Sequence, residues 1–177
     1  MLKPLCKFVY FKLLGWRIKG ELPLHLKKYV IAVAPHTSAW DFVIGITLRK
    51  MLSMEWMKFF GKEQLFRPPY GWWFRWMGGH PIVRSKSVNQ VQQIINYFNE
   101  NENFIGVIAP EGTRKKVTKL RTGFYYIAKG ANVPILLVSF DYPSKTVVFR
   151  EPFYPTDNAE ADLEFIQNYF QQFRGRR

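Results

Sequence analysis

Tyr29-Val-Ile-Ala-Val-Ala34 is a short apolar run, rich in β-branched residues, that ends at Pro35. A second run, Phe104-Ile-Gly-Val-Ile-Ala109, has the same character and ends at Pro110. Runs of this length and composition are typical of strands buried on both faces of a parallel sheet. The two runs therefore predict two central strands of an α/β domain.

The segments around these runs alternate between helical and strand patterns, with no internal repeat. Apolar spacing predicts helices over 40–54, 123–129 and 159–173, another one from Val91 to Phe98 with Ser87 as its N-cap, and a short one within 67–79. Shorter strands are expected at 56–60, 81–83, 134–140 and 146–149, the last at an edge of the sheet. This order predicts one layered α/β domain with a mixed, mostly parallel sheet flanked by helices.

The N-terminal residues 2–16 form a segment of a different kind, in which Lys3, Lys7 and Lys12 interrupt many apolar side chains. It has neither the unbroken apolar core of a signal peptide nor the ~20 apolar residues of a membrane-spanning helix. One interpretation is a short amphipathic interfacial helix whose apolar side chains face lipid, namely Phe8, Phe11, Leu14 and Trp16. The other is that the same residues pack on the protein's own core. We therefore divide the chain into an interfacial segment, 1–16, and a domain, 17–177.

The composition indicates an anionic partner. The 177 residues include 26 Lys+Arg and 13 Asp+Glu, a net charge of +13, and 18% are aromatic. The aromatic content excludes a disordered chain, and a single cysteine, Cys6, excludes a disulfide framework. With only three histidines, no metal site is expected. The charge fits either nucleic acid or an anionic lipid surface, but no RRM-, zinc-finger- or KH-like signature is present and the basic residues are scattered.

Two polar clusters follow the two apolar runs, at the end of the strand where α/β folds place ligands. His36 and Asp41 follow the first run, and Glu111-Gly-Thr-Arg114 follows the second. A carboxylate close to a histidine can hold one tautomer of the ring and stabilise its protonated form, which suits general-base catalysis. The alternative is a packed loop histidine and an aspartate that only begins a helix.

Together the clusters resemble the glycerolipid (lysophospholipid) acyltransferase family, to which 1-acylglycerol-3-phosphate acyltransferase belongs. His36-x-x-x-x-Asp41 resembles the first block of the family and Glu111-Gly112-Thr113-Arg114 the third. The segment from Gly78 to Arg84 is similar to the second block, and Val133-Pro134-Ile135 to the fourth. The four blocks stand in the family's order and cover most of the chain.

The resemblance implies acyl transfer from a thioester, on acyl-CoA or acyl carrier protein, to the hydroxyl of a lysophospholipid. His36 would be the general base and Asp41 would orient it. Arg84 and Arg114 would bind the phosphate of the acceptor, with Glu111, Gly112 and Thr113 in the same acceptor site. The acyl donor is a co-substrate, so no cofactor is expected.

Three other functions stay open at this point. The acceptor could be another lyso-lipid or an amino-acid lipid used by the same base. The chain could also be a lipid-binding protein with an inactive site, or a basic nucleic-acid-binding module.

The resemblance also implies access to a membrane, and we expect peripheral attachment to the anionic, cytoplasmic face. Besides residues 2–16, a cluster of aromatic residues mixed with Arg67 and Arg75 suits a membrane interface, namely Tyr70, Trp72, Trp73 and Trp76. A tryptophan-rich corner of the core explains this cluster equally well. The basic run from Arg114 to Arg121 is interpreted as a phosphate or headgroup surface rather than a solvated loop.

Overall fold

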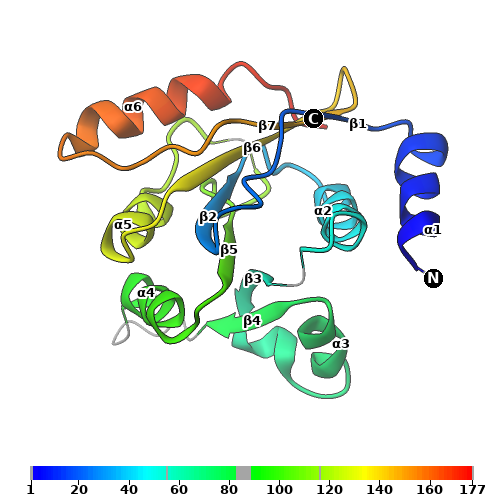
Figure 1. Cartoon of the computed structure of the whole chain (residues 1–177), viewed down its shortest axis with the longest axis horizontal. Coiled ribbons are helices and arrows are strands. Elements are labelled where there is room, and N and C mark those ends of the chain that lie inside the picture. The colour runs from blue at the N-terminus through cyan, green and yellow to red at the C-terminus, as the bar shows by residue number, and fades with distance from the viewer. Residues whose placement is uncertain (1, 55, 83–88, 116, 177) are drawn as a thin grey trace.

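In a computed structural model, which describes residues 2–54, 56–82, 89–115 and 117–176, the centre of the molecule is one seven-stranded sheet (Figure 1). The strands are β1 (Arg17–Lys19), β2 (Lys28–Val33), β3 (Met57–Lys62), β4 (Gly79–Ile82), β5 (Phe104–Ile108), β6 (Ile135–Asp141) and β7 (Thr146–Phe149). Their order across the sheet is β1-β7-β6-β2-β5-β3-β4. Only the β6–β7 pair is antiparallel among these strands, so the predicted mixed, mostly parallel sheet is confirmed.

Helices cover both faces of the sheet (Figure 1). They are α1 (Leu2–Phe8), the π-helix η1 (Val9–Leu13), α2 (Trp40–Met51), the 3-10 helix η2 (Glu63–Phe66), α3 (Gly71–Trp76), α4 (Gln90–Glu100), α5 (Gly123–Gly130) and α6 (Ala159–Phe170). One apolar cluster joins the sheet to α4, α5 and α6, and a second joins the opposite face to η1 and α2. The sheet thus forms the middle of three layers.

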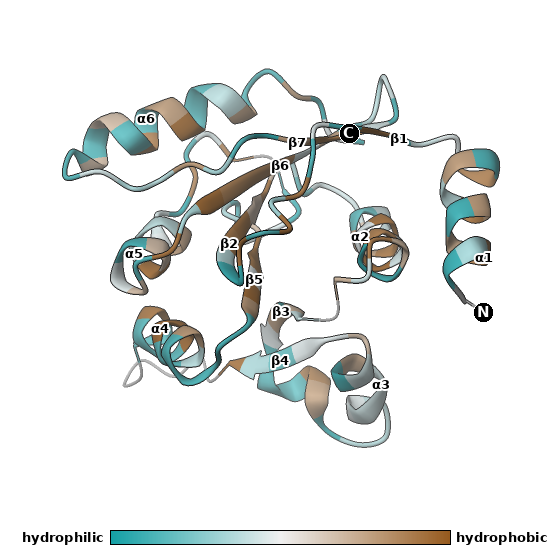
Figure 2. Ribbon diagram, viewed as in Figure 1, coloured by the Kyte–Doolittle hydropathy of each residue, from teal (hydrophilic) through white to brown (hydrophobic). Residues whose placement is uncertain are grey.

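The burial of β2 explains why the run that begins at Tyr29 is continuously apolar. Val30 and Ala32 point into the cluster with α4, α5 and α6, whereas Tyr29 and Ile31 point into the cluster with η1 and α2. All four side chains are buried, and Figure 2 shows the central strands as the most hydrophobic part of the ribbon. Burial on both faces removes the alternation that a half-exposed strand would show.

The N-terminal segment combines both interpretations of its sequence. Phe8 and Phe11 are exposed, as expected for an interfacial surface. Trp16, however, is buried and packs edge to face on Phe140, and Leu14 is partly buried against the same core cluster. The expectation that Trp16 and Leu14 face lipid was therefore wrong, because the chain enters β1 beside β7 and carries them onto the core.

The aromatic cluster of helix α3 lies at the surface. Its side chains keep large exposed fractions: 70% for Tyr70, 71% for Trp72, 44% for Trp73 and 68% for Trp76. A tryptophan-rich corner of the core, the alternative explanation of this segment, is therefore contradicted. No helix in the described part of the chain combines the length and apolar character needed to cross a bilayer.

Several element boundaries differ from expectation. Strand β7 was expected at the edge of the sheet, but β1 pairs with it in parallel and forms that edge. Strand β1 could not be predicted because it is three residues long and two of its side chains are basic and exposed. Helix α4 has Asn89 as its N-cap, whereas the expected N-cap, Ser87, lies outside the described residues, as does Val83. Helix α6 ends at Phe170 rather than at Phe173.

Candidate active site

His36 and Asp41 lie together at the carboxyl end of β2. His36 is in the loop that follows the strand, and Asp41 is in the first turn of α2. The chain turns within these few residues, so that His36 Nδ1 lies 3.1 Å from Asp41 Oδ2. The Asp41 side chain is fully buried and that of His36 is 24% exposed. With the Nδ1 proton directed at the carboxylate, the Nε2 lone pair on the far side of the ring is available to accept a proton.

Further donors hold the Asp41 carboxylate. The backbone N–H of Ser38 donates to Oδ2 at 2.8 Å, and the hydroxyl of Tyr142 donates to Oδ1. Burial alone raises the pKa of Asp41, but the hydrogen bonds from His36, Tyr142 and Ser38 outweigh it and hold the pKa below its usual value. Asp41 is therefore ionised at neutral pH, which lets it fix the ring of His36 and stabilise its protonated form.

Glu111 reaches the same loop from β5. Its side chain is buried, and Oε2 accepts a hydrogen bond from the backbone N–H of His36 at 3.1 Å. Burial raises the pKa of this carboxyl, and the nearby Asp41 raises it further, against the lowering effect of His36. Glu111 and Thr37 line a cavity of about 650 Å³ together with the C-terminal residues Phe173 and Gly175. The structure thus gives Glu111 a contact with the loop after β2, and its expected contact with the acceptor stays a prediction.

Gly112 occupies a position that requires glycine. Its φ is +63°, a conformation that costs residues with a Cβ, and a Cβ there would lie 2.7 Å from Nε of Arg121. The backbone N–H of Arg121 in turn donates to the carbonyl of Pro110 at 2.8 Å. The glycine therefore allows a guanidinium to fold against the loop that follows β5.

A groove of about 360 Å³ brings His36 together with Thr113, Arg114 and Arg121. Its other walls are mostly apolar and come from α4, α5 and the sheet, through Ile82, Val91, Ile94, Val107, Phe124 and Ile127. Basic groups beside the histidine and apolar walls elsewhere match a ligand that has both an anionic head and a hydrocarbon chain. Gly112 also lines this groove.

The groove contains three of the residues that the sequence singled out for the acceptor, Gly112, Thr113 and Arg114, alongside His36. Arg84, the second expected phosphate ligand, lies outside the described residues, as does Lys116 of the basic run. The described residues contain no group of three or more His, Cys, Asp or Glu side chains arranged to hold a metal ion.

Sequence reasoning missed Tyr142. This residue comes directly after β6, a strand that pairs in parallel with β2, so both strands end at the same edge of the sheet. The signal that could have found it is its position, because Tyr142 follows β6 as the two polar clusters follow β2 and β5.

The model of the Acyltransferase family matches residues 16–141. A curated relative, the 1-acyl-sn-glycerol-3-phosphate acyltransferase of Streptococcus pneumoniae (strain ATCC BAA-255 / R6), is 30% identical over 151 residues, which cover 78% of this chain and 55% of the relative. The chain thus spans about half the length of this relative.

Among solved structures, the crystal structure of the 1-acyl-sn-glycerophosphate (LPA) acyltransferase PlsC from Thermotoga maritima superimposes with a TM-score of 0.65 at 20% identity. The match covers 97% of this chain and 77% of PlsC, and at this identity it shows a common fold. The family match covers both polar clusters and the strands that carry them, and it agrees with the motif order in the sequence. The chain belongs to the acyltransferase family.

Proposed function

We propose that this chain transfers a fatty acyl group from an acyl thioester, acyl-CoA or acyl carrier protein, to the hydroxyl of a lysophospholipid such as 1-acylglycerol-3-phosphate. The observation that carries the proposal is the His36–Asp41 pair, whose histidine lines a groove together with Arg114. The names of the two relatives supply the acceptor class. Family membership also favours this function over nucleic-acid binding, the other class that the charge allowed.

In the proposed reaction, His36 Nε2 accepts the proton of the acceptor hydroxyl while the hydroxyl oxygen attacks the carbonyl carbon of the thioester. Asp41 holds the ring in place and stabilises the imidazolium that forms. The tetrahedral intermediate then collapses by breaking its C–S bond, and the imidazolium returns the proton to the leaving thiolate. The substrate supplies the nucleophile, so no acyl-enzyme forms.

Arg114 and Arg121 suit the phosphate of the acceptor, because a guanidinium can donate two parallel hydrogen bonds to phosphate oxygens. Both line the groove beside His36, and the apolar walls suit an acyl chain. Arg84 is the further phosphate ligand that the family resemblance implies.

Peripheral attachment to an anionic membrane surface is part of the proposal. Two exposed surfaces support it: α1 and η1, with Leu5, Phe8, Phe11 and Leu13, and α3, with Tyr70, Trp72, Trp73 and Trp76. Lysines 3, 7 and 12 and arginines 67 and 75 accompany them and are also exposed. Aromatic side chains suit the boundary between headgroups and acyl chains, and basic ones are attracted to anionic lipids. We expect the cytoplasmic face, where anionic lipids concentrate.

The test combines one labelled acyl donor, offered as acyl-CoA and as acyl carrier protein, with a panel of lyso-lipid acceptors. We expect the label on phosphate-bearing lysolipids, and we expect His36→Ala to abolish the transfer while remaining folded and bound to anionic vesicles. His25→Ala is the matched control, because His25 is exposed in the loop before β2. Turnover retained in His36→Ala would overturn the mechanism. Label found only on an amino-acid lipid would show that the acceptor is an amino-acid lipid and not a lysophospholipid.

A second variant tests the acceptor site. Arg114→Ala should mainly raise the KM for the acceptor, because binding of the phosphate does not change between ground state and transition state. An unchanged KM would remove Arg114 from the acceptor site.

A further inference from the structure

The two oxygens of the Asp41 carboxylate have different partners. Oδ2 faces His36 Nδ1 at 3.1 Å and accepts the Ser38 N–H at 2.8 Å. Oδ1 accepts the hydroxyl of Tyr142, which is 101 residues further along the chain. A carboxylate held at one oxygen only can rotate about its Cβ–Cγ bond. A bond to the second oxygen opposes that rotation and keeps Oδ2 directed at the ring of His36.

Tyr142 is itself held from several directions. Its ring lies edge to face against the buried Trp16, with ring centroids 5.0 Å apart. Its backbone N–H donates to the carbonyl of Arg174 at 3.0 Å, and its carbonyl accepts the N–H of Lys145 at 3.1 Å. Burial and the bond to Asp41 raise the pKa of the phenol, so Tyr142 keeps its proton and remains a donor.

We propose that Tyr142 is a positioning residue for acyl transfer, which holds the Asp41 carboxylate in the rotation that orients His36. This inference rests on the proposed function, and it adds to it a residue from a third strand end. Tyr142 acts through Asp41 and contributes in the step where His36 takes the proton from the acceptor. In metal sites, hydrogen-bond partners that orient a ligand from behind typically affect affinity or activity by about 10- to 100-fold, and we expect an effect at the lower end of that range here.

The ring and the hydroxyl of Tyr142 can be separated by substitution. Tyr142→Phe keeps the ring against Trp16 and removes only the hydrogen bond to Asp41, whereas Tyr142→Ala removes both. A role in packing alone would be affected by the alanine variant and restored by phenylalanine. If Tyr142 positions Asp41, acyl-transfer activity should fall in both variants.

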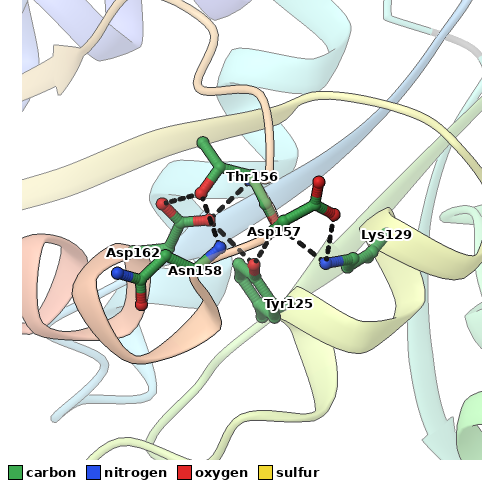
Figure 3. Close-up of polar contacts among 6 residues, drawn as sticks. All are labelled: Tyr125, Lys129, Thr156, Asp157, Asn158 and Asp162. Carbon is green, nitrogen blue, oxygen red and sulfur yellow. Dashed lines mark hydrogen bonds and ion pairs between the residues drawn. The ribbon is translucent and has the colours of Figure 1, made fainter.

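The chain also offers a matched control. Tyr125 donates its hydroxyl to the buried carboxylate of Asp162 at 2.8 Å, in the network that joins α5 to the start of α6 (Figure 3). Tyr125→Phe therefore removes the same type of hydrogen bond, from a residue that lines neither the cavity beside Glu111 nor the groove beside His36. We expect Tyr125→Phe to lower the stability of the fold about as much as Tyr142→Phe does, while the hydrogen bonds of Asp41 stay intact.

The experiment measures steady-state acyl transfer and thermal unfolding for the wild-type chain, Tyr142→Phe, Tyr142→Ala, Tyr125→Phe and His36→Ala. For Tyr142→Phe we expect kcat to fall by about tenfold with the KM of both substrates unchanged, the signature of an interaction that acts in the transition state. For Tyr125→Phe we expect a comparable fall in unfolding temperature and an unchanged kcat.

Three results would overturn the positioning role: a kcat of Tyr142→Phe within twofold of wild type, a change in KM alone, or an equal loss of kcat in Tyr125→Phe. The His36→Ala arm keeps the two proposals distinguishable. If His36→Ala is inactive and Tyr142→Phe is normal, only the role of Tyr142 fails. If His36→Ala retains turnover, the proposed mechanism fails.

Discussion

The pKa values of the two carboxylates beside His36 shift in opposite directions, although burial raises both. Asp41 faces three donors, and they hold its pKa below the usual value in spite of burial. Glu111 accepts one hydrogen bond, from the backbone N–H of His36, and burial raises its pKa. Each donor favours the ionised form and burial opposes it. Three donors outweigh burial at Asp41, whereas at Glu111 one donor does not, and the charge of Asp41 adds to the effect of burial there. The free energy of unfolding should therefore depend on pH in opposite ways for variants of Asp41 and variants of Glu111.

Asp41→Asn tests the lowered pKa of Asp41. A depressed pKa means that the ionised carboxylate contributes stability above its unfolded pKa of about 3.9, and that this contribution is lost as the pH falls through the folded pKa. We expect the variant to be less stable than the wild type at neutral pH, and the difference to close below about pH 4. Acyl transfer should fall by roughly 10²- to 10⁴-fold. Urea unfolding across a pH series checks the trend, which a pH-independent difference would contradict.

Glu111→Gln tests the raised pKa of Glu111. Because the folded pKa is raised, the folded chain binds this proton more tightly than the unfolded chain, and stability falls as the pH rises above about 4.3. Glutamine offers the same acceptor oxygen to His36 N–H without a charge. We expect Glu111→Gln to be at least as stable as the wild type at neutral pH, with the gain vanishing in acid.

The control for this prediction is Glu111→Ala, which leaves the His36 N–H without its acceptor and should cost about 1–3 kcal/mol. Denaturant unfolding of both variants at neutral and acidic pH makes the comparison. Equal destabilisation by glutamine and alanine would show that the charge of Glu111 is needed.

Among the elements, helix α4 forms one wall of the groove through Val91 and Ile94. Its first turn is capped by Asn89, whose Oδ1 accepts the N–H groups of Val91 and Gln92 at 3.0 and 3.3 Å. Capping satisfies backbone donors that have no partner inside the helix. The cap therefore fixes where this wall of the groove begins.

Asn89→Ala should lower the free energy of unfolding by about 1 kcal/mol, the usual cost of losing a side-chain cap. Asn99→Ala, at an exposed position near the other end of α4, is the matched control and should leave stability unchanged or slightly higher, since alanine favours helix. Chemical denaturation measures both. Equal losses in the two variants would contradict the capping role.

At the scale of the whole molecule, parallel pairing places three strand ends together. Ala32 of β2 pairs with Ile108 of β5 on one side and with Leu137 of β6 on the other. The loops that follow these strands carry His36, Glu111 and Tyr142. Glu111 contacts the backbone of His36, and Tyr142 contacts Asp41, the partner of the His36 ring. The site therefore depends on the register of the sheet as much as on the residues themselves.

Helices α1 and α3 both lie on the right-hand side of Figure 1, and their exposed aromatic side chains lead to a prediction about membrane binding. Replacing Trp72 and Trp76 together by alanine should weaken binding to anionic vesicles at least about tenfold, because burying an aromatic side chain contributes about 1.5–3 kcal/mol. Tyr154→Ala is the control, since Tyr154 is 61% exposed and lies beyond β7. Co-sedimentation measures both, and unchanged binding of the tryptophan variant would exclude α3 from the interface.

Much of the fold could be predicted from the sequence alone. The runs that became β2 and β5 are recognisable because strands buried on both faces are continuously apolar. His36 and Asp41 could be paired because their contact is local, within one turn of chain. The same local reasoning missed β1, whose three residues carry too little pattern, and placed the cap of α4 two residues early.

What only the tertiary structure decided are the contacts between residues far apart in the chain. Glu111 contacts the backbone of His36 across 75 residues, and Tyr142 contacts Asp41 across 101 residues. Tertiary packing likewise buries Trp16 and leaves Trp72 at the surface, although both stand in similar basic and aromatic surroundings. The physical reason is that a side chain's environment is set by whichever distant strand or helix packs against it, whereas its periodicity is set by its neighbours in sequence.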